Sequence, residues 1–142
     1  MRVITYKFIS IFCLVLNTNC HVDRYELTKE ELIIQEELKK EFNCNKIEFR
    51  HDAEAIVQEQ NDGIFDVTLC DTFCQMDSVT ISFNTVKMAN KIIPVLSHNE
   101  NYKYLTFYTS KTTPFLPKTT KLTCQKTITF LICEPNKIYT LE

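Results

Sequence analysis

Acid–base catalysis and metal binding both need histidine beside carboxylates, and the sequence offers one such cluster. His51 is followed by two carboxylates, Asp52 and Glu54, and the other histidines of the chain are His21 and His98. On a strand, successive side chains point to opposite faces, so His51 and Asp52 would act together only if a turn brought them round. We therefore expect a solvated strand end here, with neither a catalytic site nor a metal site.

Cysteine chemistry is the second option, because the chain contains seven cysteines. Cys70 and Cys74 are four residues apart, and in an extended strand they would lie ~13 Å apart, too far to bond to each other. Zinc would need more ligands in register, and nothing near the cysteines indicates a nucleophile. We expect structural disulfides whose connectivity the sequence leaves open. The candidates are Cys44, Cys70, Cys74, Cys124 and Cys133.

The glycine count excludes two common chemistries. Gly63 is the only glycine in the chain, whereas phosphate-cradling loops and the nucleophile elbow of serine hydrolases need several. We expect a protein without catalytic activity, with no cofactor and no metal.

An aromatic stretch is the strongest candidate for a contact surface. Tyr102, Tyr104 and Tyr108 fall on one face of an expected strand, and Leu105 and Phe107 fall on the other. Aromatic rings beside lysines stack on ligands or meet a partner. The alternative is a cross-strand aromatic pair that only supports the sheet.

A loop with two apolar residues between prolines is expected at residues 112–118. Prolines lower the entropy that a loop loses on binding, so Phe115 and Leu116 would either anchor a partner or pack under the sheet. The candidate binding surface comprises Tyr102, Lys103, Tyr104, Tyr108, Lys111, Phe115, Leu116, Lys118 and Lys121.

Charge is distributed unevenly along the chain. Residues 21–86 contain 6 basic and 15 acidic residues, and residues 87–137 contain 8 basic and 2 acidic residues. Either the two halves face and partly neutralise each other, or the basic half forms a surface for a polyanion.

The N-terminus has the layout of a secretory signal. Arg2 and Lys7 precede an uncharged apolar run at residues 8–16, and a polar stretch follows. The run is shorter than the roughly 20 residues that span a bilayer. We expect a signal peptide at residues 1–20 and a single disulfide-stabilised domain at residues 21–142; a buried strand and a lipid-modified Cys20 are the alternatives. Cleavage after Cys20 leaves five cysteines, which would form two bridges and one free or intermolecular thiol, and cleavage before Cys20 leaves six, enough for three bridges.

One helix is expected directly after the signal. Thr28 and Glu31 match a capping box, and Leu27 and Leu32 match a hydrophobic staple. Apolar residues then recur at helical spacing until Asn43, which is suited to end the helix.

From residue 46 onward the pattern has a period of two, which predicts roughly seven or eight short strands. Examples are Phe65 to Leu69, Val79 to Phe83, and an apolar run at residues 92–96. Gly63 is expected to supply a positive φ in a turn. No helix-length pattern separates the strands, so a parallel βαβ arrangement is not expected. The predicted fold is α+β, with one N-terminal helix packed on a mainly antiparallel sheet; the alternative is a small closed β-barrel with an N-terminal helix.

These observations predict a small secreted binding or interaction protein without catalytic activity. The expected partner is an extracellular protein or a polyanion, with no intracellular nucleic acid and no membrane span. The alternative is a secreted carrier that holds a small apolar ligand in a β-barrel cavity.

Overall fold

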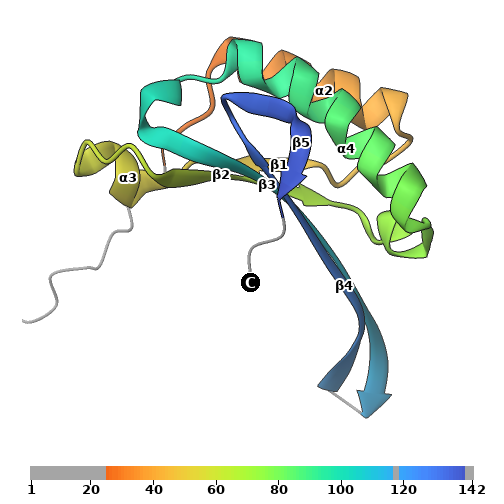
Figure 1. The fold of residues 1–142 in the computed structure, drawn as a ribbon. Helices are drawn as coiled ribbons and strands as arrows, with labels where there is room; N and C mark the ends of the chain where they lie inside the picture. The colour runs from red at the N-terminus through yellow and green to blue at the C-terminus, as the bar shows by residue number, and fades with distance from the viewer. Residues whose placement is uncertain (1–24, 117–118, 140–142) are drawn as a thin grey trace, which may run out of the picture.

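The computed structural model describes residues 25–116 and 119–139, and it contains a five-stranded sheet with helices over one face (Figure 1). The α-helices are α2 (Lys29–Glu41), α3 (Ala53–Val57) and α4 (Ser78–Ile92). The strands are β1 (Glu48–Arg50), β2 (Gly63–Leu69), β3 (Tyr102–Leu116), β4 (Thr119–Leu131) and β5 (Glu134–Tyr139). Short 3-10 helices are η1 (Asp71–Gln75), η2 (Ile93–Val95) and η3 (Asn99–Asn101). The expected signal peptide, residues 1–20, lies outside the described residues.

Helix α2 begins with the capping box that the sequence predicts. The Thr28 hydroxyl accepts a hydrogen bond from the Glu31 N–H at 3.3 Å, and the Glu31 carboxylate accepts one from the Thr28 N–H at 2.8 Å. Two N–H groups that a helix start would leave unpaired are thereby satisfied. The capping-box prediction is confirmed, and the buried Leu38 joins this helix to the core.

Helix α4 stands where the sequence predicted a strand. Its buried residues recur at helical spacing: Ile81, Thr85, Met88, Ala89 and Ile92. Asp77 caps the helix by accepting hydrogen bonds from the N–H groups of Val79 and Thr80. The alternation of Val79, Ile81 and Phe83 indicated a strand only because Val79 and Phe83 are apolar residues that point to solvent.

The sheet is mixed, which corrects the predicted antiparallel arrangement. β2 and β3 are parallel and are connected through α4, whereas the other three neighbouring pairs are antiparallel. A βαβ crossover is therefore present, contrary to expectation. The order β1-β2-β3-β4-β5 leaves β1 and β5 as edges of a curled open sheet, so the described strands do not close into the alternative barrel.

Other apolar runs also belong to elements that the sequence did not predict. The run that contains Ala55 and Val57 is helix α3, and residues 92–96 contain the end of α4 and the 3-10 helix η2. The period-two pattern also predicts separate strands at Leu122 to Cys124 and at Ile128 to Ile132, but β4 is one strand from Thr119 to Leu131 and Ile132 follows it.

The hydrophobic core lies between the sheet and helices α2 and α4 (Figure 1). Phe65, Phe107 and Phe130 come from three adjacent strands, Phe73 comes from η1, and all four are at most 1% exposed. The rings of Phe107 and Phe130 meet edge to face with centroids 5.7 Å apart. Aromatic burial of this kind supplies much of the stability of a small domain.

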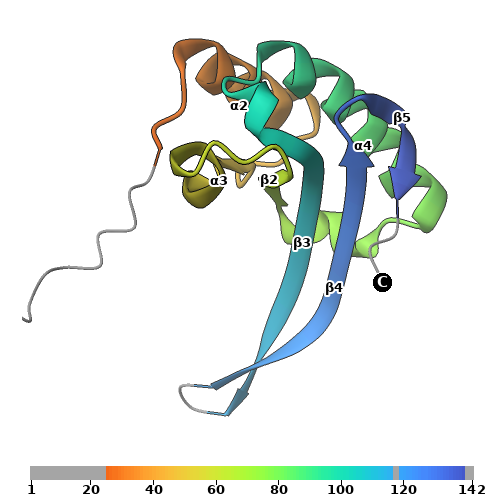
Figure 2. The same cartoon turned by 60° about the vertical axis from the view of Figure 1, so that its left-hand side comes forward.

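Strands β3 and β4 continue beyond the rest of the sheet. The last pair between β2 and β3 is Leu69 with Thr109, and β5 pairs only with residues 129–131 of β4. Among the described strands, residues 110–116 and 119–125 pair only with each other. They extend from the body as a two-stranded hairpin, here called the arm (Figure 2). The predicted loop at residues 112–118 was wrong, because Pro114 lies in β3 opposite Thr120.

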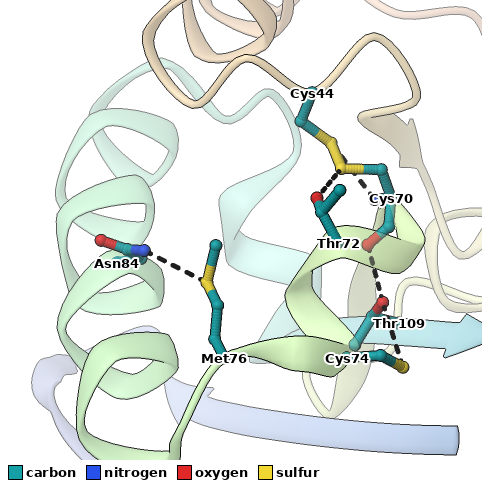
Figure 3. Close-up of a disulfide and its surroundings, with 7 residues drawn as sticks. All are labelled: Cys44, Cys70, Thr72, Cys74, Met76, Asn84 and Thr109. Atoms are coloured by element: carbon teal, nitrogen blue, oxygen red, sulfur yellow. Dashed lines mark hydrogen bonds between the residues drawn. A yellow bond between two sulfur atoms is a disulfide. The ribbon is translucent and has the colours of Figure 1, made fainter.

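Two disulfides hold the region where the arm leaves the body. Cys44 is bonded to Cys70 and Cys74 to Cys124, with Cα–Cα distances of 5.9 and 6.1 Å. The first bond joins the end of α2 to the end of β2, and the second joins η1 to β4. Figure 3 shows the Thr109 hydroxyl donating to the Cys70 carbonyl at 2.8 Å, which fixes β3 at the same point.

Gly63 does not have the positive φ that the sequence predicted. It begins β2 at a point of close approach, since an added Cβ would lie 2.5 Å from the Ala55 Cβ and 2.7 Å from the Asn101 carbonyl oxygen. The absence of a side chain at residue 63 thus allows α3 and η3 to pack against the sheet.

Candidate binding surface

His51 converges with a carboxylate, but in the core and not at the solvated strand end that the sequence predicted. Its Nδ1 lies 2.8 Å from the Tyr102 hydroxyl, and its Nε2 lies 3.2 Å from the Glu31 carboxylate. The other oxygen of Glu31 accepts hydrogen bonds from the N–H and the hydroxyl of Ser97, at 2.8 Å each. The side chains of Glu31 and His51 are 0% exposed, so no substrate reaches this pair in the described structure.

The electrostatics of this cluster fit a structural role. Burial raises the pKa of Glu31, but hydrogen bonds from His51, Thr28 and Ser97 outweigh it and lower the pKa to about 2. Burial raises the pKa of the Tyr102 phenol above its usual range. Glu31 is therefore ionised and Tyr102 protonated at neutral pH, and the cluster ties α2 to the start of β3.

The other two residues of the predicted histidine cluster, Asp52 and Glu54, lie at the start of helix α3. Asp52 caps the helix by accepting a hydrogen bond from the Ala55 N–H at 3.1 Å, and Glu54 is exposed in its first turn. His98 is also exposed, with a left-handed backbone at φ 55°. Among the described residues, no three His, Cys, Asp or Glu side chains are placed to hold a metal ion.

The three tyrosines predicted to share one face of a strand do not all do so, because Tyr102 lies on the other side from Tyr104 and Tyr108. The register with β2 shifts between the pairs Gly63–Tyr102 and Ile64–Tyr104. As a result Tyr102 turns into the core, where its ring stacks on His51 at 5.9 Å. Tyr104 and Tyr108 are half-buried on the face away from the core, opposite to the buried Leu105 and Phe107.

The candidate lysines that the structure describes lie in β3 and β4. Lys103 is exposed, with its ammonium 5.3 Å from the centre of the Tyr104 ring. Lys111 is half-buried in β3, and Lys121 is exposed in β4. No described carboxylate forms an ion pair with these three lysines, whereas Lys87 and Lys91 of α4 both pair with Glu41 of α2.

Three residues of the predicted surface lie toward the end of the arm. Phe115 and Leu116 are the last residues of β3, and their side chains lie outside the described part of the structure, as does Lys118. Leu122, which sequence reasoning did not place on the surface, is 50% exposed beside Lys121. The sequence around Leu122 carries no signal of this exposure, because it depends on how far β4 extends beyond β5.

Of the five cysteines proposed for disulfides, four are bonded. Cys133, at the turn between β4 and β5, is a free and exposed thiol. Disulfide bonding is thus present in the pattern of two bridges and one free thiol within the described residues.

Comparison with protein-family models, with curated proteins and with solved structures gave no match. Within the described residues, no helix has the length and apolar character needed to cross a membrane.

Proposed function

We propose that this chain is a small secreted binding protein without catalytic activity. Its contact surface is the arm together with Tyr104 and Tyr108 on the open face of the sheet at the base of the arm. The observation that carries this proposal is the extension of β3 and β4 beyond every other described strand.

The arm is difficult to explain as part of the core. A two-stranded ribbon is marginally stable in water, and exposed strand edges favour unwanted pairing. Here the Cys74–Cys124 bond and the Thr109 hydroxyl hold the base of the ribbon against η1. A domain that maintains such an extension gains nothing from it in core packing, so contact with a partner accounts for it best.

Two further observations support the proposal. Disulfide bonds persist mainly in oxidising compartments, and the two present here fit secretion. The histidine–carboxylate pair of Glu31 and His51 is buried and is hydrogen-bonded to Thr28, Ser97 and Tyr102. A catalytic histidine–carboxylate pair would instead lie in a cleft that a substrate can enter.

The alternative of a carrier for a small apolar ligand has no observation in its favour. Four phenylalanines fill the space between the sheet and the helices, and the described strands leave two open edges. A barrel carrier needs a closed wall and an internal cavity.

The test shortens the arm. Lys111 and Cys124 are paired across the hairpin, so residues 112–123 can be replaced by Asn-Gly, a dipeptide that forms tight two-residue hairpins. This variant keeps the Cys74–Cys124 bond. Fluorescently labelled wild type and variant are then applied to arrays of identified extracellular proteins and glycans.

We expect wild type to bind at least one array member and the shortened variant to lose that binding, with the thermal unfolding temperature and both disulfides unchanged. Binding that survives in the shortened variant would contradict a role for the arm. An array on which wild type binds nothing would contradict the proposed function as a whole.

A further inference from the structure

The arm exposes a strand edge that no described strand covers. On the side of β4 away from β3, strand β5 pairs with residues 129–131 only, so residues 120–128 have no partner strand in the described structure. Alternate N–H and C=O groups of an antiparallel edge strand point outward, where they can pair with a further strand.

The corresponding edge of β3 is less accessible. Strand β2 ends at Leu69, and η1 follows directly, packs on β3 and is tethered to the arm by the Cys74–Cys124 bond. A strand approaching residues 110–116 from that side would meet η1 at the base of the arm. The edge of β4 is thus the better site for a strand from outside.

Charge defines the kind of strand that fits. The sequence contains no Asp or Glu between Glu100 and Glu134, and Lys111 and Lys121 have no described ion-pair partner. On β4, Lys121 and Leu122 are both exposed and adjacent, so they point to opposite faces. A strand beside them would gain from an acidic residue on one face and an apolar residue on the other.

We propose that the outer edge of β4 in the arm binds an extended acidic segment of a partner protein, which adds a strand to the hairpin. This inference rests on the proposed function, because it takes the arm as the contact element and names its partner. Backbone hydrogen bonds supply the affinity, and Lys121 and Leu122 select the side chains, as in other complexes formed by strand addition.

Two other occupants fit the observations less well. A second copy, paired arm to arm, would bring together two lysine-bearing strands with no carboxylate between them. A polyanion needs many free cations, but the Lys126 ammonium donates to the Met76 carbonyl at 2.5 Å and Lys103 lies over Tyr104 at the other end of β3.

The experiment begins with a displayed library of random peptides of about 12 residues, long enough to cover one strand edge. Selection uses the oxidised full-length exported protein. We expect the enriched peptides to alternate acidic residues with apolar or β-branched residues. Enrichment of peptides without acidic residues would contradict the proposal.

A matched pair of charge reversals tests the site. We expect Lys121→Glu to weaken binding of the selected peptides about tenfold or more. Lys29→Glu makes the same change in net charge at an exposed position in the first turn of α2, where a carboxylate suits the helix dipole. It should change the affinity by less than about twofold. Equal effects of the two variants would overturn the proposal.

Backbone pairing is tested with N-methylated peptides. Successive N–H groups of an extended peptide point to opposite edges, so methylating one alternate set should abolish binding and methylating the other set should not. Hydrogen exchange of residues 119–128 should slow when the unmodified peptide binds. If neither methylated set loses affinity, the edge is not the site.

The outcomes separate this inference from the proposed function. Peptides that need the arm but tolerate both Lys121→Glu and methylation would leave the arm as a contact surface and remove the strand-addition proposal. Heparin retention without any arm-dependent peptide would contradict it in favour of a polyanion. A dimer that dissociates when the arm is shortened would contradict it in favour of a second copy.

Discussion

At the scale of single residues, the most informative group is the cluster of Glu31, His51 and Tyr102. A buried carboxylate is costly unless hydrogen bonds replace its lost water. Glu31 receives such bonds from two N–H groups, from the Ser97 hydroxyl and from His51. The same residue therefore caps its own helix and joins that helix to the sheet.

The cluster predicts a specific loss of stability in acid. The pKa of Glu31 is lowered from 4.5 to about 2 in the folded protein, so its stabilisation is complete above its unfolded pKa and is lost as pH falls from there toward about 2. The shift corresponds to about 3 kcal/mol at neutral pH. The measurement is the free energy of unfolding in urea between pH 7 and pH 2.

Glu31→Gln is the control, because Glu41 and Asp77 also have lowered pKa values and add to the acid sensitivity of the wild type. We expect the difference in stability between wild type and Glu31→Gln to shrink as the pH falls. A difference that stays constant across this range would show that the Glu31 carboxylate carries no such linkage.

At the scale of elements, Gly63 shows how one residue allows three elements, β2, α3 and η3, to pack together. Its added Cβ would clash with Ala55 of α3 and the backbone of Asn101 in η3. We expect Gly63→Ala to destabilise the protein by about 1–3 kcal/mol, because overpacking forces neighbours apart. Thermal and urea unfolding measure this.

The Gly63→Asn variant distinguishes two reasons for a glycine at position 63, which are close packing against neighbouring atoms and an unusual backbone conformation. Asparagine tolerates a positive φ well, so it would be accepted if conformation were the reason for the glycine. We expect it to destabilise at least as much as alanine. A stable Gly63→Asn variant would contradict the packing explanation.

The elements also show what the sequence could and could not predict. Helix α2 was predictable because the capping box at Thr28 and Glu31 is a local signal. Helix α4 was not predicted, because β-branched residues and the exposed Val79 and Phe83 imitate a strand. The helix start at Asp77 was visible in the sequence but was outweighed by that alternation.

Where the candidate surface residues lie in the fold was predictable only in part. Tyr104 and Tyr108 share one face of β3, as the alternation predicted, whereas Lys111 and Lys121 lie in the arm, which the sequence did not predict. Tyr102 does not share their face, because a register shift between β2 and β3 is a tertiary feature. The arm itself depends on where β2 and β5 end, which no single strand pattern contains.

At the scale of the whole molecule, one of the two disulfides connects the body to the arm. The Cys74–Cys124 bond closes a separation of 50 residues, and bonds of this kind typically stabilise by ~2–4 kcal/mol. We expect the double variant Cys74→Ala, Cys124→Ala to lose stability in that range. Cys133→Ser, which changes only the free exposed thiol, should change stability by less than about 0.5 kcal/mol.

The most direct test of the proposal that the protein is exported and oxidised is a count of its thiols by mass. Protein recovered from the medium is alkylated before and after reduction, and its intact mass is measured. We predict that residues 1–20 are absent, that Cys133 alone is alkylated before reduction, and that Cys44, Cys70, Cys74 and Cys124 react only afterwards. Recovery only inside the cell, with residues 1–20 attached and all thiols reactive without reduction, would contradict the account.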